Sequence, residues 1–296
     1  MNNIQITILT ATYNRAHLLP DLYQSLCRQT CKDFIWVVVD DGSKDGTSDL
    51  VRGWMTPDNG FHIDLYTQPN AGKDRAVNNG VSHITTPYTM IMDSDDYLTD
   101  DAVAFLLKAL AGISGLKALA GISGFRGESE VKALNRMEGE WVDASNLERK
   151  ALGIDRDCCE VYRTDLLRSH PFEVWEGEKF TPEEVVWNQL ALEGYKLRWF
   201  NKVTCIVRYQ EGGLTLDSWG LFKKNPMGYA MMFNHRLLYS HSIGERINNI
   251  LQFICCCYVG GNLSYISHSN NKLLTYLLLP AGVMLGIRRK KQICPK

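Results

Sequence analysis

The stretch VVVDDGSKDG, residues 37–46, runs from three valines into a loop of acidic and small residues with two glycines. Asp41, Ser43 and Asp45 alternate along this loop before Gly46, which resembles the first half of a calcium-binding EF-hand loop. The twelfth position of such a loop requires a bidentate glutamate, but Arg52 occupies it here. Calcium is therefore disfavoured, and two interpretations remain: a strand that ends at a nucleotide site, or a strand followed by a plain Asp-Gly turn.

The residues on either side alternate between short β-rich runs and helical runs, which is typical of parallel βαβ units. We expect strands at residues 4–9, 34–39, 62–67 and 88–92, and helices at 17–29, 47–55 and 73–83. Three of these strands end in polar motifs: TATYNR, DDGSKDG and DSDD. Ligands of open α/β sheets bind beyond the carboxyl ends of the strands, so the three motifs are expected to line one crevice. The sequence thus predicts an α/β fold with a mostly parallel central sheet flanked by helices.

The composition excludes several classes of protein. With 296 residues and 45% hydrophobic content the chain can bury a large core, and a net charge of -1 gives no overall attraction for nucleic acid. The first residues lack a basic segment leading into an apolar one, so we expect no secretory signal and a cytoplasmic protein. The nine cysteines lack paired CxxC spacing and are expected to be buried free thiols.

The segment MDSDDYL, residues 92–98, places Asp93, Asp95 and Asp96 at the end of an apolar strand. Crowded carboxylates repel one another, and a divalent cation such as Mg²⁺ or Mn²⁺ would neutralise them with oxygen ligands. A helix N-cap would explain one of the three acids but not all of them. The cluster therefore favours a metal site.

Residues 108–116, KALAGISGL, and 117–125, KALAGISGF, form a tandem repeat that differs only in its last residue. Two units of nine residues cannot stack into a solenoid. We expect the second copy to contribute a strand, and the first copy to lengthen the preceding helix or loop.

The βαβ rhythm stops after Gly213, where we place a boundary before a helical C-terminal segment, 214–296. Within it, residues 273–287 are apolar and are followed by the basic run RRKK. The apolar run is shorter than the roughly twenty residues that span a bilayer, so we interpret it as lying on a membrane surface. The alternative is a buried hairpin broken at Pro280 and Gly282.

The motifs TYNR, DDGS and DSDD, in this order, resemble those of family 2 glycosyltransferases with the GT-A fold, and the resemblance covers residues 4 to about 213. It implies a nucleotide-sugar half at 1–100, an acceptor half at 101–213, and a bacterial polysaccharide-synthesis type of enzyme. Asp93 and Asp95 match the DxD metal motif, and Asp95 is the expected direct ligand. The residues implied for donor binding are Thr12, Tyr13, Asp40, Asp41, Lys73, Arg75 and Ser94; Lys73 and Arg75 could equally be exposed helix charges.

The acceptor side is implied by similarity of the segment WEGEKFTPEEVVWNQ, residues 175–189, to the part of the family that supplies a catalytic base. The chain has Pro-Glu-Glu where the commoner motif reads Glu-Asp, so the base is either Glu183 or Glu184. Pro182 suits the first turn of a helix, and we favour Glu183 because it is closer to the loop. Trp187 is expected in the core, and Trp175 either in the core or against a sugar ring.

The expected function is a metal-dependent inverting transfer of a sugar from a nucleoside diphosphate, most simply a UDP-sugar, to a glycan or polyprenyl-phosphate-linked acceptor. The expected location is the inner face of the cell membrane. One rival is a non-catalytic nucleotide-sugar or glycan-binding protein on the same fold, because fold alone does not prove turnover. A second rival, a nucleotidyltransferase, lacks a Gly-rich phosphate loop after the first strand.

Overall fold

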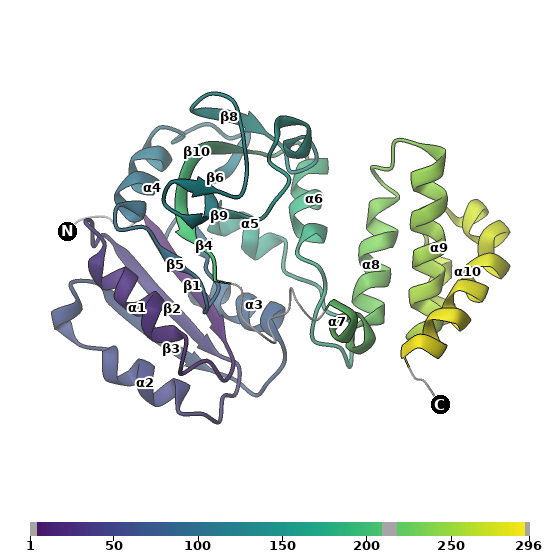
Figure 1. Cartoon of the computed structure of the whole chain (residues 1–296), viewed down its shortest axis with the longest axis horizontal. Coiled ribbons are helices and arrows are strands. Elements are labelled where there is room, and N and C mark those ends of the chain that lie inside the picture. The colour runs from purple at the N-terminus through teal and green to yellow at the C-terminus, as the bar shows by residue number, and fades with distance from the viewer. Residues whose placement is uncertain (1–4, 209–217, 294–296) are drawn as a thin grey trace. The chain divides into compact units, whose positions relative to one another are not determined.

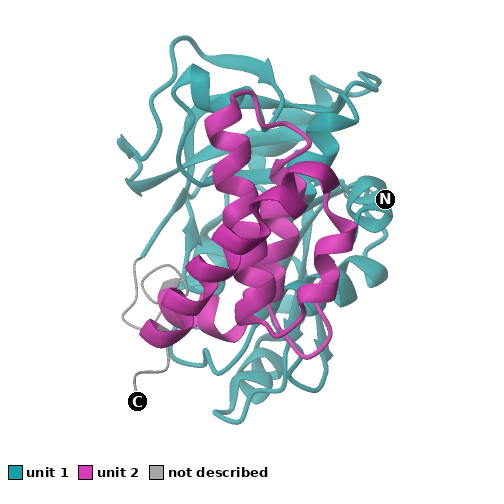
Figure 2. Ribbon diagram, turned by 90° about the vertical axis from the view of Figure 1, so that its right-hand side faces the viewer, with its two compact units in different colours: residues 1–171, 186–210 teal, residues 172–185, 211–296 magenta. Residues whose placement is uncertain are grey.

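The computed structural model describes residues 5–208 and 218–293, and it divides into two compact units (Figure 2). The first, here called the sheet unit, comprises Met1–Pro171 and Val186–Gln210. The second, the helical unit, comprises Phe172–Val185 and Glu211–Lys296. The expected boundary after Gly213 lies outside the described residues, and the inclusion of residues 172–185 in the helical unit was not expected from the sequence.

The sheet unit is built on a mixed sheet (Figure 1) whose strand order is β3-β2-β1-β4-β9-β6-β10-β5. The short strand β7 pairs with β6, and β8 pairs with β10. The neighbours β3, β2, β1 and β4 run parallel, as the βαβ rhythm predicts, and β9 is antiparallel to both β4 and β6. The strands are β1 (Ile6–Thr12), β2 (Phe34–Asp40), β3 (His62–Thr67), β4 (Tyr88–Ile91), β5 (Tyr97–Leu98), β6 (Leu119–Ser129), β7 (Lys132–Ala133), β8 (Trp141–Ala144), β9 (Cys158–Arg163) and β10 (Lys196–Ile206).

Alternate strand residues point to opposite faces of the sheet. Because apolar side chains lie on both faces of the central strands, helices cover both faces. Ile8 and Val38 belong to a core cluster that also contains apolar side chains of α1, α2 and α4. Gly80 of α3, by contrast, lies against Leu9 and Val39. The helices of this unit are α1 (Leu19–Arg28), α2 (Thr47–Trp54), α3 (Lys73–His83), α4 (Ala102–Ala111) and α5 (Thr164–Ser169), and α6 (Glu184–Leu192) starts in the helical unit and continues here. The predicted α/β fold with flanking helices is confirmed.

The two copies of the nine-residue repeat adopt different structures, as expected. The first copy supplies the last turn of α4, which ends at Ala111, and then a turn. The second copy supplies most of β6, which lies between β9 and β10 and is almost entirely buried. Tertiary position, and not local sequence, therefore decides the conformation of this segment.

The helical unit contains α7 (Ser218–Lys224), α8 (Pro226–Arg236), α9 (Ile243–Val259) and α10 (Lys272–Ile293). Their shared core includes Phe253, Ile254 and Cys257 of α9, on which Leu274, Leu278 and Val283 of α10 pack. Residues 172–185 join this unit partly through Glu178, whose carboxylate accepts hydrogen bonds from the backbone N–H groups of Met227 and Gly228, both at 2.8 Å. These N–H groups belong to the first turn of α8, which has no earlier carbonyl partners for them.

The alternative of a buried hairpin broken at Pro280 and Gly282 is wrong, because α10 continues through both residues as one helix. Pro280 lies on the exposed side of α10, where water can satisfy the carbonyl group that proline leaves without a backbone donor. Gly282 packs directly on Ile254, and Gly286 on Tyr258, so these glycines allow α10 to approach α9 closely. Among the described residues, no helix is both long enough and apolar enough to cross a bilayer.

Replacing Gly80 by alanine is expected to destabilise the sheet unit. A Cβ atom at this position would lie 2.3 Å from Leu9 Cδ1 and 3.1 Å from Val39 Cγ2, so α3 or the buried side chains would have to move. We expect the free energy of unfolding to fall by about 1–3 kcal/mol, measured by urea denaturation. Gly53→Ala is the matched control, because nothing lies within 4 Å of its added Cβ. An equal effect of both substitutions would contradict close packing of α3 on the sheet.

Candidate functional site

The three strand-end motifs meet at one edge of the sheet. Thr12, the last residue of β1, is paired with Asp40, the last residue of β2. The backbone N–H of Asp41 donates to the carbonyl of Thr12 at 2.8 Å, which holds the two loops together where the strands end. On the other side of β1, Met92 donates to the carbonyl of Leu9 at 2.8 Å, and the DSDD motif follows directly. The expected convergence of the three motifs is therefore observed.

The TYNR and DDGSKDG loops are joined by reciprocal hydrogen bonds. Asn14, in the left-handed region with φ 52°, donates its N–H to Ser43 Oγ at 2.8 Å and accepts from the N–H of Lys44 at 2.8 Å. Asp45 accepts from the N–H of Ala16 at 3.0 Å and from Thr47. Asp45 thus holds backbone N–H groups, which explains its position without a calcium ion.

Asp40 and Asp41 are almost completely buried, and both already accept hydrogen bonds from the protein. Asp40 accepts from the N–H of Ser43 at 2.9 Å and from the hydroxyl of Ser48. Asp41 accepts from the side chains of Gln68 and Asn70 and from the backbone N–H groups of Ala71 and Gly72, at 2.8–3.1 Å. The structure therefore gives Asp41 a clear role in shaping the segment that leads into α3, while its contact with a nucleotide stays a prediction.

The neighbouring expected donor residues differ in accessibility. The Tyr13 side chain is 44% exposed at the sheet edge, whereas Thr12 is buried and its hydroxyl has no hydrogen-bond partner among the described residues. Ser94 is also buried, and Arg75 donates to the carbonyl of Ala71 at 3.0 Å. Tyr13 is thus the residue of this group best placed to stack on a planar ligand.

Asp93 lies at the centre of a charged cluster. Lys73, the first residue of α3, places Nζ 2.6 Å from Asp93 Oδ1. Arg126 of β6 places Nη2 3.1 Å from Asp93 Oδ2 and Nη1 2.7 Å from Asp96 Oδ2, and its Nε donates to the carbonyl of Cys158 at 2.9 Å. Arg126 was missed by the sequence analysis, although a charged residue inside the apolar run LAGISGFRG was a signal of a buried ion pair.

The two paired carboxylates have opposite pKa shifts. Burial would raise the pKa of Asp93, but Lys73 and Arg126 outweigh it and hold this pKa well below its usual range. For Asp96, burial raises the pKa to about 7, with the negative charges of Asp93 and Asp95 acting in the same direction and Arg126 against them. The cluster therefore keeps Asp93 ionised at neutral pH.

The chemistry of these side chains fits a divalent cation held together with a diphosphate. Mg²⁺ is typically bound by one or two carboxylates plus phosphate oxygens and water, so Asp93 and Asp95 would suffice. A larger group of three or more His, Cys, Asp or Glu side chains suited to a metal is not found in the described part of the chain. The pair thus suits a cation that arrives with phosphate better than one bound by protein alone.

The candidate bases belong to the helical unit. The α6 helix begins at Glu184, so Glu183 and Pro182 precede it, and Pro182 lies two residues before the first helical turn in which it was expected. Glu184 makes a two-point ion pair with Arg236, at 2.6 and 2.8 Å. This pair ties the start of α6 to α8 and gives Glu184 a structural role.

The two tryptophans of the acceptor segment are both packed against aromatic rings. Trp187 stacks on Tyr162 within the sheet unit, with ring centroids 4.3 Å apart, but it is only half-buried, so it lies at the edge of the core and not inside it as expected. Trp175 makes an edge contact with Tyr265 within the helical unit, with centroids 4.8 Å apart.

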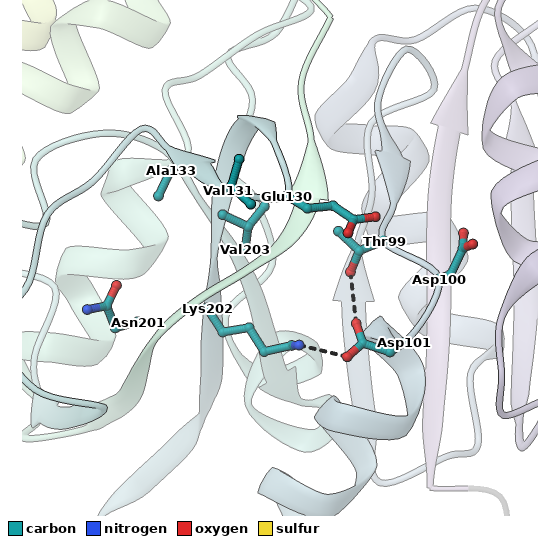
Figure 3. Close-up of a pocket in the computed structure, with 9 residues that line it drawn as sticks. All are labelled: Thr99, Asp100, Asp101, Glu130, Val131, Ala133, Asn201, Lys202 and Val203. Atoms are coloured by element: carbon teal, nitrogen blue, oxygen red, sulfur yellow. Dashed lines mark hydrogen bonds and ion pairs between the residues drawn. The ribbon is translucent and has the colours of Figure 1, made fainter.

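A cavity of about 590 Å³ lies elsewhere in the sheet unit, between the β6–β7 hairpin, β10 and the loop after β5 (Figure 3). Asp100, Asp101 and Glu130 line it, and Lys202 pairs with Asp101 at 2.7 Å. None of the residues expected to bind donor, metal or acceptor lies in this cavity.

The chain matches the family model described as Glycosyl transferase family 2 over residues 7–169. The chain belongs to this family. Among curated relatives, a teichoic acid poly(glycerol phosphate) polymerase of Staphylococcus epidermidis is 28% identical over 168 residues, which is 56% of this chain and 23% of the relative. The chain spans less than two thirds of the length of the curated relatives that match it first.

Solved structures show the same fold. S. aureus TarS 1-349 in complex with UDP-GlcNAc matches with a TM-score of 0.60 at 16% identity, covering 98% of this chain and 90% of TarS. The mannosyltransferase PcManGT from Pyrobaculum calidifontis, in complex with GDP-Man and Mn²⁺, matches with a TM-score of 0.57 at 16% identity, covering 98% and 83%. The expected GT-A type of fold and the expected family are confirmed.

Replacing Asp41 by asparagine tests its role as an acceptor for the 68–72 segment. An amide would direct its NH₂ group at N–H donors that now face a carboxylate oxygen, so we expect the free energy of unfolding to fall by about 1.5–3 kcal/mol. Asp49→Asn is the control, because Asp49 makes an exposed ion pair with Arg52 and the change should stay within about 0.5 kcal/mol. Chemical denaturation measures both; an Asp41→Asn protein as stable as the wild type would contradict this role.

Proposed function

We propose that the chain transfers a sugar from a nucleoside diphosphate sugar to a glycan or lipid-linked glycan acceptor in cell-surface polysaccharide synthesis. The observation that carries the proposal is the meeting of the TYNR, DDGS and DSDD loops at one sheet edge in a member of glycosyl transferase family 2. The UDP-GlcNAc complex of TarS supports a UDP-sugar as the donor. The polymerase relative supports a polymeric acceptor.

The roles proposed for the donor-side residues follow their placement. Tyr13 stacks on the base, and Asp40 presents the remaining acceptor capacity of its oxygens to the nucleoside. Asp41, whose oxygens already accept four hydrogen bonds from residues 68–72, shapes the loop that surrounds the nucleoside. Lys73 and Arg75, in the first turn of α3, neutralise the diphosphate, and the positive end of the helix adds to this effect.

Asp93 and Asp95 would hold a divalent cation, Mg²⁺ or Mn²⁺, which when bound neutralises charge on the departing diphosphate. The Mn²⁺ complex of PcManGT supports this use of a cation on the same fold. Asp95 is proposed as the ligand that binds the cation directly, and Asp93, which is held by Lys73 and Arg126, can add an oxygen only by sharing or exchanging one of these partners.

Glu183 is proposed as the general base that removes the proton of the acceptor hydroxyl, with inversion at the sugar carbon. It lies in the turn before α6, whereas Glu184 lies inside the helix and binds Arg236. An ordinary glutamate is ionised at neutral pH and can accept a proton once the hydroxyl is within hydrogen-bond distance. A non-catalytic sugar-binding protein would need no general base.

The proposed activity is tested with the purified chain by following nucleoside diphosphate release from a panel of donors with Mn²⁺. We expect release to require one donor, the cation and an acceptor, and to be abolished in Asp95→Asn, which removes a charge without changing volume. Circular dichroism should show an intact fold. Full activity of this variant, or undiminished wild-type activity in excess EDTA, would contradict the metal assignment.

The base is tested by comparing Glu183→Gln with Glu184→Gln. We expect Glu183→Gln to lower kcat by about 10²–10⁴ with donor binding retained, which is the range for a lost general base. Glu184→Gln is expected to lower stability instead, because it weakens the two-point ion pair with Arg236. Steady-state kinetics and thermal melts on both proteins decide the assignment. A large loss of kcat only in Glu184→Gln would identify Glu184, and not Glu183, as the general base.

We further propose that α10 binds the inner membrane surface. Its inward side packs on α9, whereas the large apolar side chains on its other side are exposed and recur at helical spacing: Leu273, Tyr276, Leu277, Met284 and Ile287. The exposed residues Arg288, Lys290 and Lys291 follow, while Arg289 points inward and donates to Gln252 at 2.7 Å. An apolar stripe ending in basic residues is suited to an anionic lipid surface.

Substitutions on the exposed side of α10 test this association without removing the cover of the α9 core. Leu277→Gln with Met284→Gln is expected to reduce cosedimentation with phosphatidylglycerol vesicles. Arg288→Gln with Lys291→Gln should weaken it by about tenfold or more, since each basic residue near such a surface contributes about 1 kcal/mol. Leu152→Gln, an exposed position in the sheet unit, is the control. Wild-type protein that stays in solution at low salt would contradict the proposal.

A further inference from the structure

Both carboxylate oxygens of Asp93 are occupied by cations of the protein itself. Lys73 Nζ lies 2.6 Å from Oδ1, and Arg126 Nη2 lies 3.1 Å from Oδ2. The motif that is expected to bind metal is therefore also the site of two ion pairs. A divalent cation that is to use Asp93 has to share or replace one of these partners.

The two cations are not equally replaceable. Arg126 uses three nitrogens, which reach Asp93, Asp96 and the carbonyl of Cys158, and its side chain is only 16% exposed. Moving it would strand the buried carboxylate of Asp96, and a buried charge without its partner is strongly destabilising. Lys73 is 27% exposed, lies at the first position of α3 and carries its charge on a flexible stem. Lys73 is the cation that can leave.

An ammonium group and a divalent cation exclude one another at Asp93 Oδ1. Mg²⁺ lies about 2.1 Å from its oxygen ligands, so it would sit within a few ångströms of an ammonium held at 2.6 Å from the same atom. When Asp96 is ionised, above its pKa of about 7, the three aspartates against Lys73 and Arg126 give the cluster three negative and two positive charges, or -1. A divalent cation alone would make it +1, whereas a cation with a doubly charged diphosphate returns it to -1.

We propose that Lys73 and the divalent cation are alternative occupants of Asp93, exchanged when the nucleoside diphosphate binds. This inference rests on the proposed donor site, and it makes tight metal binding conditional on the nucleotide. Lys73 moves from the carboxylate to the diphosphate, which offers several acceptor oxygens and, in the proposed donor site, would lie at the positive end of α3. Lys73 thereby acts as a positioning residue that couples metal binding to donor binding.

The test measures Mn²⁺ binding to the full chain by electron paramagnetic resonance, with and without UDP. For the wild type we expect weak binding that tightens by about tenfold or more when UDP is present. Lys73→Met, which keeps the length of the side chain without its charge, should bind Mn²⁺ about tenfold more tightly than the wild type when UDP is absent. The same variant should bind UDP less tightly, measured by calorimetry.

Two further variants make the result specific to the charge at this position. Lys73→Arg keeps a cation beside Asp93 and should retain weak nucleotide-free Mn²⁺ binding. Lys202→Met removes another partly exposed lysine that pairs with an aspartate at 2.7 Å, far along the chain from the DxD motif, and should change neither measurement.

Unchanged or weaker nucleotide-free Mn²⁺ binding in Lys73→Met would overturn the exchange, as would a wild type that binds UDP but binds Mn²⁺ equally well with and without it. Failure of the proposed function has a different signature. In that case the wild type would show no sugar transfer or UDP binding, while the nucleotide-free comparison of wild type and Lys73→Met would still decide whether Lys73 competes with metal.

Discussion

The buried carboxylate of Asp41 is the interaction on which the geometry of the candidate site depends. It follows β2 directly and collects two backbone N–H groups and two side-chain amides from the segment between β3 and α3. One charged side chain therefore fixes where α3 begins, and with it the position of Lys73. An ionised acceptor suits this position because hydrogen bonds to a charged group are stronger than those to a neutral one. Asp41 thus contributes to the site mainly by placing other residues.

A second constraint joins the two halves of the sheet unit. Arg126 comes from β6, yet two of its three contacts are to acids in the loop after β4. Because β9 lies between β4 and β6, this contact reaches over a strand that separates them in the sheet. Arg126, which is distant in the sequence, therefore neutralises part of the negative charge of the strand-end acids. The charge balance of the DSDD loop is a property of the folded unit and not of the motif.

The first half of the fold could be predicted because its information is local. Strands β1 to β4 and helices α1 to α3 follow from short-range periodicity, and parallel neighbours with helical crossovers bring their carboxyl ends together. Arg126 could not be placed in this way, since its partners depend on which strands become neighbours. The sequence could not decide whether the helix breaks at Pro280, because this too depends on tertiary contacts. The packing of Gly282 and Gly286 on α9 explains why the helix continues. Residues 172–185 likewise join the helical unit through contacts with α8, which local sequence patterns cannot predict.

Either copy of the tandem repeat could in principle form β6, and the ion pairs of Arg126 favour the second copy. The two copies share eight residues, so β6 could be drawn from either, with the chain displaced by nine residues. Only the second copy is followed by arginine; in the displaced alignment Lys117 would take the place of Arg126. A lysine carries a single ammonium group and cannot span Asp93, Asp96 and the Cys158 carbonyl as the guanidinium does. The displaced sheet would bury acids without adequate compensation, so the cluster that prepares the site also selects which copy of the duplicated segment becomes a strand.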